Sequence, residues 1–564
     1  MNTVKRLMIV ALCWLGMVSL ASAQQTSFRY ELLSLLPEDF AVSVVMHDLR
    51  GHSARWEQAD WLKGLKQSAL GKALLGSPEL EQLSRMQTEL KKHLDLDWPT
   101  LRDDILGDTL VLSYSPGPKS RPDDERGLFL LHVHKPERLN SVVDKLNDAQ
   151  EKSGELHLTK LQFKGSTYFR RIQGKKNQYY FIQGSLAAVT TREEILRDVI
   201  NRLPTKSKDH AWAKRFQRAG AESAFLTMCI NPRAVEPDLV AAGKKNDPLP
   251  GYWRALDAIF VTLAVRDEAE VRLSIQANPQ HLPVWAKPAF TDTLSTSSLW
   301  QRFPERSILT IAGTTDFAGT AEALKLIMPE KDREKFATDW QAGIGAVLPL
   351  DPFKDILPNI GPDWGVCVLP SKDAKQMPPA IFALALKPGQ KGQQVGQSLF
   401  KGMQFFGGLA VLEHNKNNPK SVIRLQSLVQ DKVDVAYLNS PAFFPPGFQP
   451  ACALKEGFLL LATSPEVIAD FRGGEVKTTE RKEAPLVRLS PSELAKLLQH
   501  RREHIVAGLT ERQQMTEKNA NKNVDDVIGL LGLFERLTLS HHGDGGQAIW
   551  ILRLTPAAAA RAAK

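Results

Sequence analysis

The sequence predicts an α+β protein made of two tandem repeats, each an antiparallel sheet with helices packed on one side. Short strand-like runs separated by turn-forming residues follow one another, which is typical of antiparallel meanders. The sequence has no glycine-rich strand-to-helix turn and no regular strand–helix alternation, which argues against a nucleotide-binding, doubly wound sheet. In addition, four short motifs recur in the same order in both halves of the chain.

These recurring motifs define the repeat. Leu36-Pro37-Glu38 stands before a strand-like run and returns as Phe303-Pro304-Glu305. Their offsets vary between about 251 and 272 residues, as expected where insertions collect in loops. We therefore expect domains at residues 24–300 and 301–564. The other pairs are Asp104-Ile105-Leu106 with Asp355-Ile356-Leu357, Lys135-Pro136 with Lys387-Pro388, and residues 184–191 with 456–463.

Local patterns predict the elements of the first repeat. A strand at residues 41–46 precedes helices at 56–75 and 78–94. Apolar residues at helical spacing predict that the second of these helices buries one stripe, and Pro136 suits the first turn of a further helix. The stripe comprises Leu80, Leu83, Met86, Leu90 and Leu94. Strands are predicted at residues 109–114, 128–133, 156–163, 167–172, 179–182, 186–190, 224–230, 259–265 and 270–276.

The second repeat follows the same scheme. It begins with a strand at residues 308–312 and helices at 320–328 and 332–348. It closes with a strand at 486–489, a helix near 491–509 and a hairpin that pairs 537–540 with 548–554. Gly543-Asp544-Gly545-Gly546 supplies the positive-φ residues that this reversal needs.

The N-terminus resembles a secretory signal peptide, at residues 1–23. Lys5 and Arg6 precede an apolar stretch at 7–20, and Ala21-Ser22-Ala23 fits the small-residue cleavage rule. No later run of about 18 apolar residues occurs, so we expect no transmembrane segment after cleavage. The predicted location is therefore outside the cytoplasm, either periplasmic or extracellular.

Charge and cysteine content add weaker constraints. The net charge of +9 includes Lys5 and Arg6, so the mature chain carries about +7, which favours anionic envelope surfaces or acidic polymers. Export and the lack of a nucleic-acid motif argue against nucleic-acid partners. After cleavage three cysteines remain, an odd number that does not form a disulfide framework. We expect Cys229 to pack as a small buried hydrophobe, and a Cys367–Cys452 bridge stays an alternative.

The signal peptide, the Leu-Pro start, the Asp-Ile-Leu motif before a strand and the repeated α+β body together resemble an uncharacterised bacterial family of exported proteins, defined by a domain of unknown function. The resemblance covers most of the mature chain. It implies the duplicated α+β architecture and carries no activity, cofactor or site residue.

One motif has the residues of a metal site. His500-Arg501-Arg502-Glu503-His504 matches H-x-x-E-H, in which two histidines four apart on a helix bind zinc and the glutamate acts as base. Arg501 and Arg502 would place positive charge beside the dication, and no equivalent occurs in the first repeat. The other interpretation is a solvated helix face, and our favoured interpretation includes no metal and no cofactor.

Two histidine groups are weaker candidates. His132 and His134 flank one strand residue, so both would point to one face and could share a metal. His47, Asp48, His52 and Glu57 follow the first strand, where an Asp usually forms a turn or caps a helix. We interpret both groups as structural.

Two surface features favour binding. Residues 439–450 form a proline-stiffened loop that presents Phe443, Phe444 and Phe448, either as a contact surface or as a lid over a small core. A basic, aromatic hairpin could grip acidic groups, although alternation along a half-buried strand gives the same composition. Its candidate residues are Arg170, Arg171, Tyr179 and Tyr180.

These observations favour an exported, non-enzymatic binding or scaffold protein of the cell envelope, with an envelope protein or an acidic polymer as partner. A zinc-dependent hydrolase that uses His500, Glu503 and His504 is the first alternative. A carrier of an apolar ligand is the second.

Overall fold

The computed structural model describes residues 26–557, except 118–123, 153, 155–156, 175, 206–209, 237–252, 284–285, 292–293, 329, 372, 374–375 and 473–482. The predicted signal peptide lies outside these residues. The chain forms two compact units, Met1–Leu282 with Gly546–Lys564, and Pro283–Gly545. The first unit therefore takes its last strand from residues 546–564. The predicted boundary at residue 300 assigns this strand to the second domain.

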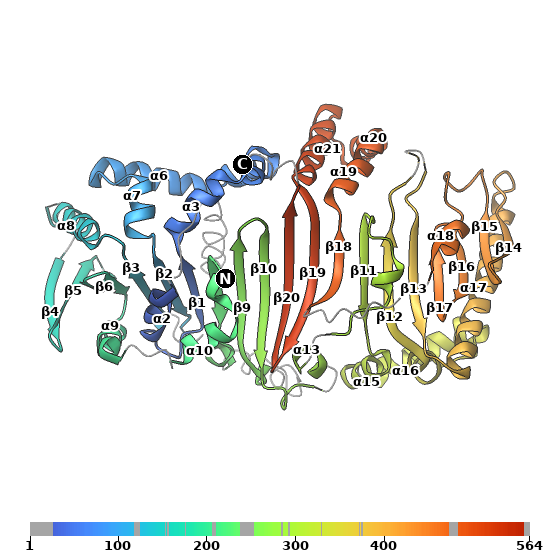
Figure 1. The fold of residues 1–564 in the computed structure, drawn as a ribbon, viewed down its shortest axis with the longest axis horizontal. Helices are drawn as coiled ribbons and strands as arrows, with labels where there is room; N and C mark the ends of the chain where they lie inside the picture. Colours follow the sequence, from blue (N-terminus) through green and yellow to red (C-terminus); the bar gives the residue numbers. More distant parts are fainter. Residues whose placement is uncertain are drawn as a thin grey trace. The chain divides into compact units, whose positions relative to one another are not determined.

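The strands of the first unit pair antiparallel throughout, in the order β20–β10–β9–β8–β1–β2–β3–β7–β6–β5–β4 (Figure 1). Buried and half-buried residues alternate strictly along β2, as expected for a strand between two packed layers. The bounds are β1 Val42–His47, β2 Thr109–Ser115, β3 Arg126–His132, β4 His157–Phe163, β5 Ser166–Gln173, β6 Lys176–Gln183, β7 Leu186–Thr190, β8 Leu226–Ile230, β9 Leu256–Val265, β10 Ala269–Ala277 and β20 Gln547–Pro556.

The α+β class is confirmed, but helices cover both faces of this sheet rather than one side. Leu128 and Leu130 of β3 pack in the core that includes α2, α9 and α10. Leu131, on the opposite face of the same strand, packs in a second core with the end of α6 and with α8. The helices are α2 Thr26–Ser34, α3 Leu49–Gln58, α4 Asp60–Gln67, α5 Ala69–Leu75, α6 Pro78–Leu94, α8 Pro136–Lys152, α9 Glu193–Arg202 and α10 Ala211–Arg218.

The strands of the second unit also pair antiparallel, in the order β19–β18–β11–β12–β13–β17–β16–β15–β14. This is the order β9–β8–β1–β2–β3–β7–β6–β5–β4 of the first unit. The agreement supports the duplication that the sequence suggests, and the duplication itself stays a prediction. The bounds are β11 Leu309–Thr314, β12 Ile360–Val368, β13 Ala380–Leu386, β14 Arg424–Gln430, β15 Val433–Asn439, β16 Ala451–Lys455, β17 Phe458–Ala462, β18 Ala484–Leu489 and β19 Phe534–Asp544.

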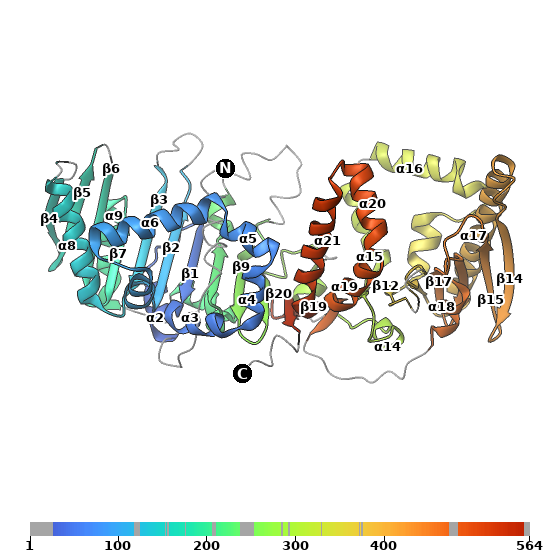
Figure 2. The same ribbon diagram turned by 90° about the horizontal axis from the view of Figure 1, so that it is seen from above.

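The helices of the second unit also lie on both faces (Figure 2). Ile381 and Ala383 of β13 share a core with α14 and α18, whereas Leu384 packs with residues of α15, α16 and α17. The helices are α13 Lys287–Thr291, α14 Leu299–Arg302, α15 Phe317–Ile327, α16 Glu330–Ala342, α17 Gln390–Asn417, α18 Pro465–Asp470, α19 Pro491–His500, α20 Arg502–Gln513 and α21 Glu517–Gly532.

The cysteines are free, and the alternative of a Cys367–Cys452 bridge is wrong for this fold. Cys367 lies on β12 and Cys452 on β16, with β13 and β17 between them. Three strand spacings of about 4.8 Å separate the two backbones, far beyond the reach of a disulfide. Cys229 is fully buried in the first core, where it packs as a small hydrophobe.

Within the described part of the chain, every helix is too short or too polar to cross a bilayer.

Candidate binding surface

Among the described residues of the second unit, exposed large apolar side chains are most numerous on α17, on β14 with the segment before it, and on the loop after β15. Eight large apolar side chains there are between 37% and 73% exposed. Apolar side chains gathered on one part of a surface mark contact sites more often than single exposed ones do. We call this set the α17 surface; it comprises Phe405, Phe406, Leu409, Leu412, Val422, Leu425, Val429 and Phe443.

The N-terminal half of α17 anchors the helix to its sheet. Val395, Gly396 and Gly402 are buried, and a Cβ at Gly396 would come within 2.3 Å of Leu386 on β13. Glycine at this position therefore allows the helix to approach the sheet closely. The C-terminal half differs, because Phe405, Phe406, Leu409 and Leu412 are exposed there.

The proline-stiffened loop joins β15 to β16 and meets the end of α17. The loop is held by the Phe444 amide, which donates to the Ser440 carbonyl at 2.8 Å. The rings of Phe443, Phe444 and Phe448 form a chain with centroids 5.1 and 5.6 Å apart. Phe443 is 52% exposed while Phe444 and Phe448 are half-buried, so the loop is partly a lid and partly a surface.

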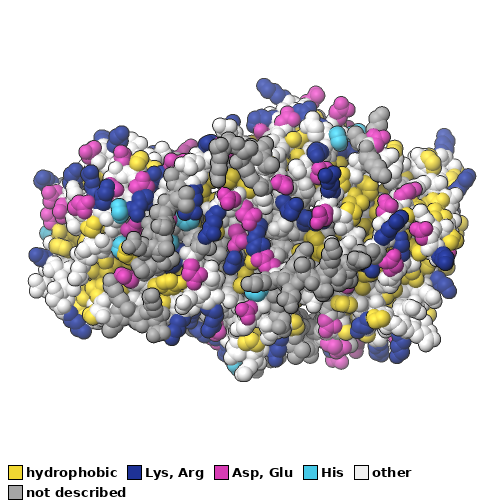
Figure 3. Space-filling view, viewed as in Figure 1, with side chains coloured by type: hydrophobic (Ala, Val, Ile, Leu, Met, Phe, Trp, Pro, Cys, Tyr) yellow, Lys and Arg dark blue, Asp and Glu magenta, His cyan; other side chains and the backbone are white. Residues whose placement is uncertain are grey.

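Basic side chains accompany the α17 surface along the sequence. Between residues 390 and 430 the sequence contains five Lys and Arg residues and one acid, Glu413. All five are exposed: Lys391, Lys401, Lys416, Lys420 and Arg424. On the face in Figure 3 acidic and basic side chains are interspersed. Residues 157–192 of the first unit also carry basic residues and no acid, so the feature particular to residues 390–430 is the combination of positive charge with several exposed apolar side chains.

The predicted basic, aromatic hairpin is β5 with β6, where Arg170 pairs with Tyr179 in register. Tyr179 is only 8% exposed and belongs to the core of the first unit. Tyr180 faces the other side, where its hydroxyl accepts from Asn147 at 2.8 Å and burial raises its pKa. Arg170 and Arg171 hydrogen bond to Asn177 and Gln178 of the same hairpin. The hairpin thus splits its predicted residues between two faces.

His47, the last residue of β1, and His52, on α3, are part of the buried interior. His47 Nδ1 lies 2.9 Å from Thr109 Oγ1, and burial lowers the His47 pKa to about 2. His52 packs against Phe225, and burial lowers its pKa to about 3. Asp48 caps α3 by accepting from the Gly51 amide at 2.8 Å, which confirms the helix-cap interpretation.

The other members of these polar groups have separate partners. Glu57 pairs with Arg102 at 2.9 Å. His132 ends β3, lies 3.1 Å from buried Asp108 and stacks on Phe28, whereas His134 follows the strand and is exposed. Among the residues that the structure describes, no three His, Cys, Asp or Glu side chains come close enough to hold a metal.

The H-x-x-E-H motif spans two helices instead of one. α19 ends at His500, Arg501 leaves the helical conformation with φ −100° and ψ 8°, and α20 begins at Arg502. The continuous helix expected near residues 491–509 is therefore wrong at this point. His500, Glu503 and His504 are all exposed. The single helical face that the zinc hypothesis requires is not formed.

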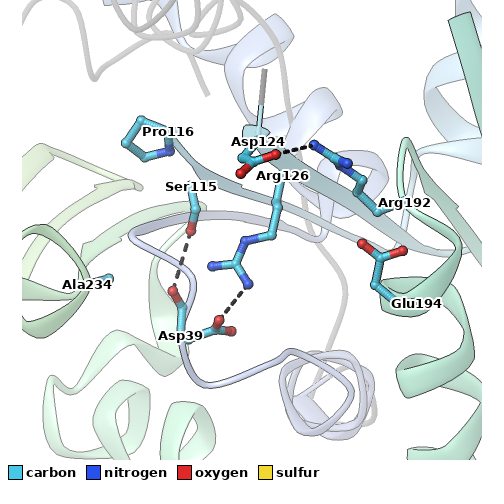
Figure 4. Close-up of a pocket in the computed structure, with 8 residues that line it drawn as sticks. All are labelled: Asp39, Ser115, Pro116, Asp124, Arg126, Arg192, Glu194 and Ala234. Carbon is cyan, nitrogen blue, oxygen red and sulfur yellow. Dashed lines mark hydrogen bonds and ion pairs between the residues drawn. The ribbon is translucent and has the colours of Figure 1, made fainter. Parts of the chain in front are cut away.

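A polar pocket of about 400 Å³ lies in the first unit, between the ends of β2 and β3 and the start of α9 (Figure 4). Arg126 pairs with Asp39 at 2.5 Å, and Arg192 lies 3.6 Å from Asp124. Ser115 accepts from the Ala41 amide and is placed to donate to the Asp39 carbonyl, so it is held as a structural group. Four of the five lining charges thus form two ion pairs, and the lining residues include no nucleophile beside a base.

No family model and no curated protein matches this chain. The family resemblance given by the short motifs therefore stays an expectation.

Sequence reasoning identified the loop of the α17 surface but not the helix. The available signal was the spacing of Phe405, Leu409 and Leu412, three or four residues apart in a long helix. Such a stripe usually packs against a core, so spacing alone does not show that it is exposed.

Proposed function

We propose that this chain is an exported, non-enzymatic binding or scaffold protein of the cell envelope, and that the α17 surface is its contact surface. The observation that supports this most is the exposure of Leu412. This side chain is 68% exposed in the C-terminal half of α17, among other exposed apolar residues and between Lys401 and Lys416. Exposed apolar groups cost solubility and are retained where a partner covers them.

The helix of the first unit that corresponds to α17 is α8, so the exposed side chains of the two helices can be compared within one chain. α8 connects β3 to β4 as α17 connects β13 to β14. Its exposed side chains are polar or charged, apart from Ala149; they include Arg138, Asn140, Ser141 and Asp144. The apolar surface is thus a property of the second unit, as a specific contact site would be, and not a general property of helices at this place in the fold.

The alternatives have less support. A zinc hydrolase needs His500 and His504 on one helical face, and the break at Arg501 separates them. A carrier of an apolar ligand needs an enclosed apolar cavity, whereas five charged side chains line the pocket of Figure 4.

Site-specific photo-crosslinking in the exporting cell tests the proposal. A photoreactive residue replaces Leu412 in one variant and the exposed Ser141 of α8 in the control. We expect a discrete crosslinked product, with lipid or with protein, from position 412 and little from position 141. No product from position 412, or equal products from both positions, would contradict the proposed function.

A further inference from the structure

The arrangement of charge along α17 points to a particular partner. At 100° per residue, Lys401, Phe405, Leu409, Leu412 and Lys416 all fall within about 80° of the helix circumference. The three apolar residues therefore form one stripe, and a lysine stands in line with it at each end. Both lysines are exposed.

This is the pattern of a helix that lies in the plane of a membrane interface. There the apolar side chains enter the boundary between headgroups and acyl chains, while long lysine side chains reach back to the headgroups. The exposed Phe443, in ring contact with His414 at 4.5 Å, adds a further aromatic group at the end of the same helix. Lys420 and Arg424 extend the positive charge beyond the helix.

Pairing with a second copy of the chain fits less well. An antiparallel pair of α17 stripes would bring Lys401 of one copy toward Lys416 of the other, and a parallel pair would bring like residues together. Each stripe contributes two lysines, with Glu413 as the single acid of the segment. Like charges that face each other oppose association, whereas phosphate headgroups neutralise them.

We propose that the α17 surface binds the surface of an anionic phospholipid bilayer, with the stripe of Phe405, Leu409 and Leu412 inserted at the interface and Lys401 and Lys416 on the lipid phosphates. This inference rests on the proposed function and names the partner of that same surface.

Vesicle flotation with the mature chain tests it. The probes are vesicles of phosphatidylglycerol mixed with phosphatidylcholine, and vesicles of phosphatidylcholine alone. We expect the chain to float with the anionic vesicles at low salt, and to bind more weakly at high salt and on phosphatidylcholine.

Three variants assign the binding to α17. Leu409→Glu/Leu412→Glu should weaken binding more than tenfold, because it places acids in the stripe. Lys401→Gln/Lys416→Gln should weaken it about fivefold for each lysine. Asn140→Glu/Ser141→Glu on α8 makes the same change in net charge as the first variant and should bind as the parent does. Circular dichroism of each variant shows that it is folded.

The outcomes separate this inference from the proposed function. Absence of vesicle binding, equal binding to both kinds of vesicle, or an equal loss in the α8 variant would overturn the inference. A dimer that Leu409→Glu/Leu412→Glu converts to a monomer by light scattering would identify a second copy as the occupant and overturn it too. If position 412 still crosslinks to an envelope protein, the proposed function remains; if it crosslinks to nothing, both are wrong.

Discussion

The ring of His414, in the last turn of α17, meets the ring of Phe443 edge-on, with centroids 4.5 Å apart and an interplanar angle of 62°. His414 Nε2 also lies 2.9 Å from the Ser421 carbonyl, at the start of the segment that leads to β14. One histidine thus connects the helix, the proline-stiffened loop and the approach to the edge strand. His414 is itself half-buried, and its two contacts hold the end of α17, the exposed Phe443 and the segment before β14 together.

Phe443→Ser should therefore separate binding from stability. Phe443 is 52% exposed, so its removal should cost about 1 kcal/mol of unfolding free energy or less, while the contact surface loses an aromatic group. Phe444→Ser is the matched variant in the same loop and should cost more, because Phe444 is half-buried between two rings. Thermal unfolding and vesicle flotation of both variants measure the two effects. A large loss of stability in Phe443→Ser would show that the loop is a lid.

Lys455→Met should destabilise the second unit. Lys455 is 8% exposed, and its Nζ donates to the carbonyls of Ile468 and Ala469, both at 2.9 Å, in the last turn of α18. Methionine keeps the aliphatic length but leaves two carbonyls without this donor, at a cost of about 1–3 kcal/mol. We expect a lower urea midpoint. Lys496→Met is the control, because Lys496 forms an exposed pair with Glu493 and should change stability by about 0.5 kcal/mol or less.

Much of the secondary structure could be predicted because its signals are local. The hairpin of β4 and β5 reverses at Lys164 and Gly165, whose φ values of 48° and 82° explain why the sequence has a glycine there. The predicted strands of the first meander agree with the observed ones within a few residues. Alternation and turn residues are sufficient for this, because neither depends on distant parts of the chain.

Features that depend on distant residues could not be predicted. Met86 was assigned to a buried stripe of α6 but is 53% exposed, because periodicity does not show where along a helix the covering layer ends. Arg29 gives no sequence signal, yet it is 1% exposed and donates to the carbonyls of Ala221 and Ala224, almost 200 residues away. The position of β8 between β1 and β9 is equally non-local.

Acid should destabilise the first unit through its buried histidines. Burial lowers the pKa of His47 to about 2 and of His52 to about 3, from the ordinary 6.5, with smaller contributions from nearby arginines. Between the folded and unfolded pKa values only the unfolded chain takes up the protons, so stability falls as the pH drops below about 6.5. The expected loss is about 1 kcal/mol for each histidine between about pH 7 and pH 5.5.

His52→Leu tests this assignment. Among the described residues His52 Nδ1 has no hydrogen-bond partner, so leucine should cost little at neutral pH and should remove one histidine's share of the acid loss. Urea midpoints across this pH range measure it. His93→Leu is the control, because His93 is exposed, and its midpoints should follow those of the parent. An unchanged pH dependence in His52→Leu would show that other groups cause the acid loss.

The three cysteines that the structure describes should differ in reactivity although none of them is in a disulfide. Burial raises the pKa of the Cys452 thiol to about 11, and it raises the pKa of Cys229 and Cys367, which are both fully buried. Because the thiolate is the reactive form, Cys452 should react with an aromatic disulfide near pH 8 about a hundredfold more slowly than free cysteine. Cys229 and Cys367 should react only after unfolding, and Cys452→Ser should remove the native-state reaction. Rapid labelling of two or more thiols in the native chain would contradict the buried positions on β8 and β12.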